Sequence, residues 1–213
     1  MDSGNATSAS DLGGHARLAE ALVASNLLVR QAAEGDLAAA GQLLHSVAPR
    51  VSAVTRAVLG PAHPDLDDAI QQSLIAFVQA LGAFRGECPP PAYAARIAVR
   101  VAIATRRRAR ATHLRVESLA TREPPPDHGP SPTDETAAGR RKTLLRDLLE
   151  EIPEEQAEAL AMRAVLGWSL DEVAVASGVP LNTVRSRVRL AKEALRRRIE
   201  ADPRLADELG VGE

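Results

Sequence analysis

The chain has very few of the residues on which most protein chemistry depends. Of its 213 residues, one is a cysteine, one a tryptophan, one a tyrosine and two are phenylalanines. With Cys88 alone, neither an intramolecular disulfide nor a zinc site with several cysteine ligands can form. The histidines, at positions 15, 45, 63, 113 and 128, are too scattered along the chain to suggest a shared metal ion. We therefore expect no metal and no cofactor.

Motifs of catalysis and of membrane targeting are missing as well. The sequence contains no glycine-rich phosphate loop, no His-Glu metal spacing and no nucleophile motif, and we expect no enzymatic activity. Its first residues, MDSGNATSASDLGG, lack the basic segment and apolar run of a secretory signal. No apolar stretch approaches the roughly 20 residues that a membrane span needs. We expect a cytoplasmic protein with no membrane insertion.

The composition favours an all-α fold. Hydrophobic residues make up 45% of the chain but aromatic residues only 2%, so leucine, valine, isoleucine and alanine must build the core. Such residues suit helices, and no run of alternating β-branched residues indicates a sheet. We predict two small helical domains joined by a flexible, proline-rich linker. The expected parts are a disordered tail (1–14), a four-helix domain (15–113), the linker (114–139), a second domain (140–201) and a C-terminal tail (202–213).

In the first domain, turn and cap residues separate the expected helices. A helix should end at Glu34 and the next begin after Asp36 as N-cap. A third helix should follow Asp65, and a fourth should span about 92–110 with Ile97 and Val101 buried. The apolar set expected to be buried by the third helix is Leu66, Ile70, Leu74, Phe77, Val78 and Leu81.

Positive charge is concentrated in two segments, although the formal net charge is only −2. One segment holds arginines 96, 100, 106, 107, 108, 110 and 115 without any acid between them. The other holds basic residues at 185, 187, 189, 192, 196, 197 and 198 and one acid, Glu193. Two separate basic patches in a nearly neutral chain indicate two contacts with one polyanion.

The segment 169–198 has the pattern of a helix-turn-helix. Ser169 and Glu172 form a capping-box pair, and Gly178 can take the left-handed conformation of a tight turn. The second helix should bury Val184, Val188, Ala191 and Leu195. About 100° around the same helix lie Arg185, Arg189, Lys192 and Arg196, a cationic row suited to the DNA major groove. A solvated basic helix is the alternative interpretation, but the capped first helix and the turn favour DNA binding.

Three stretches resemble the sigma-70 family of bacterial RNA polymerase sigma factors, in its small extracytoplasmic-function (ECF) group. They are LLVRQAAEGDLAAAGQLLHSVAPRVSAVTRAVLG (27–60), DDAIQQSLIAFVQALGAFRGE (67–87) with YAARIA (93–98), and IPEEQAEALAMRAVLGWSLDEVAVASGVPLNTVRSRVRLAKEALRR (152–197). The resemblance implies a non-enzymatic subunit that binds core RNA polymerase, recognises two promoter elements and helps to open the duplex. An anti-sigma protein would be a further partner. A helix-turn-helix regulator that is not a polymerase subunit remains the alternative.

The resemblance also implies roles for particular residues. The recognition helix would read the minus-thirty-five element through Asn182, Thr183, Arg185, Ser186, Arg189 and Lys192. The fourth helix would face the minus-ten element with Arg96, Arg100, Arg106, Arg107 and Arg108. Core polymerase would be bound by Asp67, Asp68, Gln71 and Gln72. The sequence departs from the family pattern at Tyr93, Arg100 and Ala104, where tryptophan, asparagine and aspartate are usual.

Overall fold

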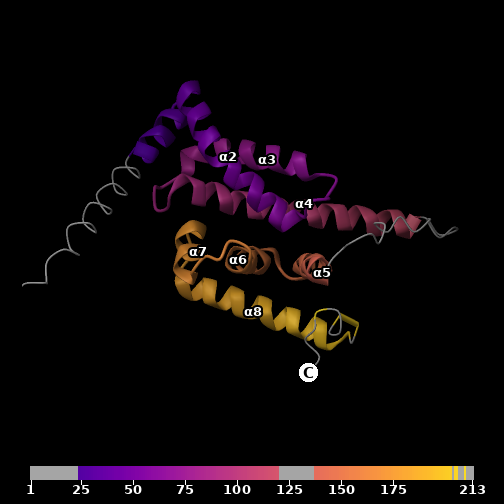
Figure 1. Ribbon diagram of the computed structural model, residues 1–213. Coiled ribbons are helices and arrows are strands. Elements are labelled where there is room, and N and C mark those ends of the chain that lie inside the picture. The colour runs from indigo at the N-terminus through magenta and orange to yellow at the C-terminus, as the bar shows by residue number, and fades with distance from the viewer. Residues whose placement is uncertain (1–23, 120–136, 203, 206–208, 210–213) are drawn as a thin grey trace, which may run out of the picture.

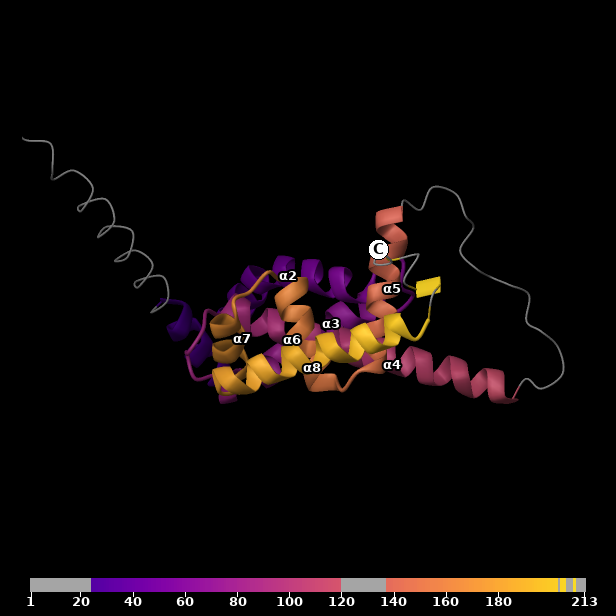
Figure 2. The same cartoon turned by 90° about the horizontal axis from the view of Figure 1, so that it is seen from below.

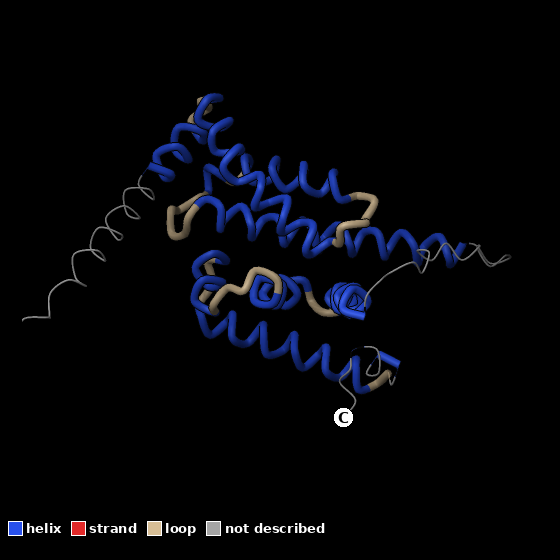
Figure 3. The backbone as a smooth tube through the Cα atoms, in the orientation of Figure 1, coloured by secondary structure: helices blue, strands red, loops and turns tan. Residues whose placement is uncertain are grey.

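The described residues fold into two layers of helices. The structure, a computed structural model, describes residues 24–119 and 137–202, together with 204, 205 and 209. Within these residues every regular element is a helix, as Figure 3 shows, and the predicted all-α fold is confirmed. The predicted N-terminal tail and the centre of the predicted linker lie outside the described residues.

The first layer contains the helical residues 24–33 and three longer helices (Figure 1). They are α2 (Leu37–Leu59), α3 (Leu66–Gln79) and α4 (Pro90–Leu119), with a short 3-10 turn, η1 (Leu81–Ala83), after α3. Asp36 caps α2 as predicted, because its carboxylate accepts hydrogen bonds from the backbone N–H groups of Ala38 and Ala39. Asp65 occupies the N-cap position of α3 but makes no side-chain cap bond.

The second layer is built from α5 (Ala137–Glu151), α6 (Glu154–Ala164), α7 (Leu170–Ser177) and α8 (Leu181–Glu200). Seen in Figure 1, this layer lies directly below α4, which contacts α5, α6 and α7. The view from below in Figure 2 shows α8 running across the outer side of the same layer. The two predicted domains therefore pack against each other, rather than standing apart on a tether.

The buried side of α3 differs from the predicted one. Its buried residues are Leu66, Ala69, Ser73 and Phe77, whereas Val78, expected in the core, is exposed. Small side chains such as Ala69 and Ser73 let neighbouring helices approach closely, and the Ser73 hydroxyl donates to the carbonyl of Ala69 within the helix. A pattern based on large apolar residues does not detect such a seam.

Helix α4 differs from the prediction in length and in its buried faces. It runs to Leu119, nine residues beyond the expected end at Arg110, and so enters the predicted linker. Ile97 and Val101, expected in the core, are only half-buried. The buried set is mainly alanine: Ala94, Ala95, Ala98, Val99, Ala102, Ile103 and Thr105. Because α4 is covered by the first layer on one side and the second layer on the other, it has no single apolar stripe.

Candidate nucleic-acid interface

Helices α7 and α8 form the predicted helix-turn-helix, and its local geometry explains the turn. The Ser169 N–H donates to Oε2 of Glu172 at 2.7 Å, and the Glu172 N–H donates to Oγ of Ser169 at 3.1 Å. The hydrogen bond from the Ser169 backbone N–H, together with one from the Ser169 side chain, lowers the pKa of the Glu172 carboxyl, because both favour its charged form. Gly178 ends α7 with φ 65° and ψ 29°, the left-handed conformation that the sequence predicted.

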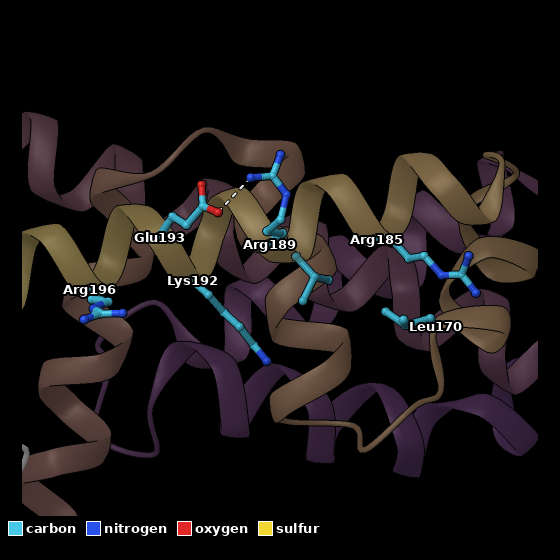
Figure 4. Close-up of a pocket in the computed structure, with 7 residues that line it drawn as sticks. Leu170, Arg185, Arg189, Lys192, Glu193 and Arg196 are labelled. Carbon is cyan, nitrogen blue, oxygen red and sulfur yellow. Dashed lines mark hydrogen bonds and ion pairs between the residues drawn. The ribbon is translucent and has the colours of Figure 1, made fainter.

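Helix α8 buries one side and exposes its cations on another. Val184, Val188 and Ala191 are buried as predicted, and Leu195 is half-buried. The predicted cationic row, which is exposed, lines a shallow hollow together with Leu170, Val188 and Glu193 (Figure 4). The row consists of Arg185, Arg189, Lys192 and Arg196. One helix thus docks on its domain and presents positive charge to solvent.

Short polar contacts within α8 hold its arginine side chains. Nη1 of Arg189 donates to Oε1 of Glu193 at 2.7 Å, the contact dashed in Figure 4. Nη1 of Arg185 donates to Oδ1 of Asn182 at 3.2 Å. Of the other predicted DNA-contacting residues, Ser186 is exposed and Thr183 is half-buried near the start of the helix. The predicted minus-thirty-five residues therefore lie together on the first three turns of α8.

The second basic patch, on α4, is in a different situation. Arg106 has a side chain only 11% exposed, and its Nη2 lies 2.6 Å from Oδ1 of Asp147 and 2.7 Å from Oε1 of Glu150. Its Nη1 donates to the carbonyl of Leu59 at 2.8 Å. Burial raises the pKa of the Glu150 carboxyl, although Arg106 acts to lower it. The guanidinium group is therefore shared between both layers.

Two further arginines of α4 also bind the second layer, through its backbone carbonyls. Arg107 donates to the carbonyl of Ile152, just after the end of α5. Arg96 donates through Nη1 to the carbonyl of Ala176, in the last turn of α7, at 2.6 Å. By contrast, Arg100 and Arg108 are exposed. The five predicted minus-ten residues thus lie on one helix, and the second layer covers three of them, Arg96, Arg106 and Arg107.

An aromatic cluster at the start of α4 was not expected from the sequence. The ring centroid of Tyr93 lies 5.1 Å from that of Phe84 and 6.3 Å from that of Phe77. The guanidinium carbon of Arg96 lies 5.7 Å from the centroid of the Tyr93 ring. Phe84 and Tyr93 line a hollow of about 270 Å³, together with Cys88 and the residues 175–178 of the helix-turn-helix. The signal was weak because the three aromatic residues are distributed over 17 positions, in α3, in the following loop and in α4.

The predicted polymerase-binding residues share one exposed face of α3. Asp67, Asp68, Gln71 and Gln72 are all exposed, and both acids lie in the first turn of the helix, where the dipole favours negative charge. Beside Gln71 an open apolar groove of about 590 Å³ runs between α2 and α3. Leu74, Ile75 and Val78 line it on the α3 side. A polar edge and an apolar groove therefore adjoin each other on this surface.

Among the described residues, no group of three or more histidine, cysteine, aspartate or glutamate side chains could hold a metal ion. In the same part of the chain, no helix is long and apolar enough to cross a membrane.

Two family models match this chain, and they fall on the two helical layers. The model "Sigma-70 region 2" matches residues 43–112, and "Sigma-70, region 4" matches residues 142–195. Together they cover more than half of the chain, in the order and on the helices that the resemblance implied. The chain belongs to the sigma-70 family. It is a transcription initiation factor of the ECF group.

Two named relatives of this sigma factor agree with that assignment. It is 27% identical over 183 residues to the ECF RNA polymerase sigma-E factor of Haemophilus influenzae, in an alignment that covers 81% of this chain and 94% of that protein. It is 28% identical over 139 residues to the RNA polymerase sigma-H factor of Pseudomonas aeruginosa, with 62% and 71% covered. A solved structure of CnrH in complex with the cytosolic domain of CnrY is 23% identical, with a TM-score of 0.48, covering 84% of this chain and 99% of that one.

Proposed function

We propose that this sigma factor reads the minus-thirty-five element with α8 and the minus-ten element with α4. The observation that carries the first assignment is the exposed cationic row on α8, which runs beside a buried apolar seam. Arginine can grip guanine through two hydrogen bonds, and short polar groups at a helix start can approach phosphates. The reading residues are Asn182, Thr183, Arg185, Ser186, Arg189 and Lys192.

The minus-ten (downstream) element would be held by α4 and by the aromatic cluster at the start of that helix. An unpaired base can stack on an aromatic ring, which contributes about 1–3 kcal/mol per base. Tyr93 is half-buried beside a hollow and already carries Arg96 over its ring, which supports this role. The arginines would bind the phosphates of the opened strand: Arg96, Arg100, Arg106, Arg107 and Arg108.

Core RNA polymerase would bind the exposed face of α3 formed by Asp67, Asp68, Gln71 and Gln72. The acids in the first turn and the adjoining apolar groove support a mixed polar and apolar docking surface. The sigma factor would act as a non-catalytic subunit in the cytoplasm, where its polymerase works. An anti-sigma protein is a further proposed partner, and a second open apolar groove, of about 960 Å³ between α5, α6 and α8, offers it a place.

Run-off transcription with reconstituted holoenzyme tests the proposal. Core polymerase with this sigma factor should transcribe a subset of a genomic promoter library, and the transcribed promoters should share two separated elements. Core polymerase alone is the control. A protein that binds promoter DNA yet yields no transcript above that control would favour the alternative, a helix-turn-helix regulator that is not a polymerase subunit.

A further inference from the structure

One large apolar side chain lies on the exposed face of α8. Leu190 is 37% exposed, and within α8, which the structure describes in full, no other large hydrophobic residue is exposed. It follows the buried Val188 by two positions, about 200° around the helix, and therefore points away from the core of its domain. Ser186 precedes it by four positions and Asn182 by eight, so these three exposed residues share one face of the helix.

The short neighbours of Leu190 on the helix leave its side chain uncovered. Residues three and four positions apart on a helix touch, and a long neighbour can cover an exposed leucine with its methylene groups. Ser186, four positions before Leu190, and Ala194, four positions after it, are too short to do so.

The two longer neighbours of Leu190 are held by other partners. Arg187, three positions before it, forms an ion pair with Glu155 of α6 and so turns towards its own domain. Glu193, three positions after it, accepts a hydrogen bond of 2.7 Å from Nη1 of Arg189 (Figure 4). Both contacts hold these side chains in place, and the exposed surface of Leu190 therefore stays available to a ligand.

An uncovered leucine among polar side chains matches one feature of the DNA major groove. Base-pair edges in that groove offer hydrogen-bond donors and acceptors, and thymine also offers an apolar C5-methyl group. The amide of Asn182, the hydroxyl of Ser186 and the guanidinium of Arg189 suit the polar edges. A methyl group offers no hydrogen bond to these side chains, whereas contact with leucine removes apolar surface of both groups from water.

We propose that Leu190 is a specificity-determining residue that recognises the C5-methyl group of a thymine in the minus-thirty-five element. This inference rests on the proposed function of α8 as the helix that reads that element. The polar side chains of α8 select hydrogen-bonding edges, and Leu190 selects the methyl group. The minus-thirty-five element of this sigma factor therefore contains at least one A·T pair.

The test uses holoenzyme reconstituted from core polymerase and the full-length sigma factor. A promoter library randomised across the minus-thirty-five element first defines the preferred sequence. Each thymine of that sequence is then replaced by deoxyuridine in synthetic templates. This replacement removes the C5-methyl group and keeps the hydrogen-bonding pattern of the base. The ratio of transcription from the thymine template to that from the uracil template is measured for each variant.

For the wild type, uracil at one position should lower transcription about fourfold, which corresponds to about 0.8 kcal/mol, the contribution of one buried group of this size. For Leu190→Ala the two templates should be transcribed equally. Leu190→Met keeps an apolar side chain of similar size and should keep most of the difference. Val165→Ala is the matched control, because it shortens an exposed apolar side chain at the end of α6, and it should keep the wild-type ratio.

The ratio separates base reading from effects on folding or on polymerase binding, because such effects change both templates alike. Equal ratios in wild type and Leu190→Ala at every thymine would overturn the proposal, as would a preferred element without an A·T pair. Either result would leave the effects of Arg185→Ala and Arg189→Ala on promoter choice intact. Failure of the proposed function would instead appear as a library without any preference in the minus-thirty-five region, and it would remove this inference as well.

Discussion

The two basic helices of this sigma factor carry similar charge but stand in opposite surroundings. Each of the two segments contains seven basic residues. On α8, Arg189 and Arg196 pair with Glu193 and Glu200 of the same helix, four residues away, and remain exposed. On α4, Arg106 and Arg110 pair with acids of another helix. A count of arginines therefore indicates affinity for a polyanion but not whether that affinity is available.

The largest expected effect concerns the difference between a covered and an exposed arginine of α4. Arg106→Ala leaves Glu150 buried without its cation, and a loss of about 3 kcal/mol in the free energy of unfolding is expected. Arg108→Ala removes an exposed side chain and should change stability by less than about 0.5 kcal/mol. Urea unfolding followed by the fluorescence of Trp168 measures both. Equal stability of the two variants would contradict the covered state of Arg106.

Substitutions on the exposed basic face of α8 should change promoter choice and leave stability unchanged. Arg185→Ala and Arg189→Ala should each lower transcription from promoters with the minus-thirty-five (upstream) element by about tenfold, since a bidentate contact to a base contributes about 1–3 kcal/mol. Their unfolding curves should match the wild type, because both side chains are exposed. The control is a promoter with a replaced upstream element, on which wild type and variants should be equally weak. Unchanged promoter choice in both variants would remove α8 from the reading role.

A third comparison distinguishes the contribution of the Tyr93 ring from that of its hydroxyl group. Tyr93→Ala should reduce transcription about tenfold on duplex templates through loss of base stacking. Tyr93→Phe should be close to the wild type, because the hydroxyl makes only a long contact of 3.5 Å to the carbonyl of Ala80. On a template with a pre-opened bubble the Tyr93→Ala defect should shrink. A defect of the same size on both templates would argue against a role in duplex opening.

The smallest effect is a pH dependence at the contact between the layers. Burial raises the pKa of Glu158 on α6, and Glu154 adds to this while Arg100, Arg96 and Arg187 oppose it. A raised pKa means that the folded chain holds this proton more tightly than the unfolded chain, so the charged form costs stability above the raised pKa. That cost disappears as the pH falls through the raised pKa towards the ordinary value of 4.5.

Glu158→Gln, which stays neutral, should therefore be more stable than the wild type at about pH 7, where an ordinary glutamate is charged. The difference should vanish as the pH approaches the ordinary glutamate value. Urea unfolding at a series of pH values measures it, with Glu155→Gln, a largely exposed position on the same helix, as the matched variant. A difference that grows on acidification would contradict a raised pKa at Glu158.

The features predicted correctly from the sequence are those that depend on residues close together in the chain. The Ser169–Glu172 capping box, the left-handed Gly178 and the buried stripe of α8 each depend on residues within two turns of one another. The same holds for Asp36 at the start of α2. Such features follow from cap chemistry and helical periodicity, without knowledge of the partner surface.

The seams of α3 and α4 could not be predicted in that way. The periodic pattern weights large apolar side chains, and it placed Val78, Ile97 and Val101 in the core. The structure instead buries Ala69, Ser73 and a series of alanines, because α4 is covered on two sides by elements distant in sequence. For the same reason the sequence pattern placed the α4 arginines at an open DNA-binding face. Their acidic partners lie 41 or more residues further along the chain.

The alanine seam between α4 and α6 has a consequence for how easily the two halves separate. Ala157 and Ala161 are fully buried, as are Ala95 and Ala98, yet each methyl group removes little apolar surface from water. A seam of leucine or phenylalanine at the same place would bind the halves far more firmly, at roughly 1.5–3 kcal/mol for each fully buried side chain. Methyl groups give a close fit with a small hydrophobic gain. The hydrophobic contribution of this seam to holding the two layers together is therefore small.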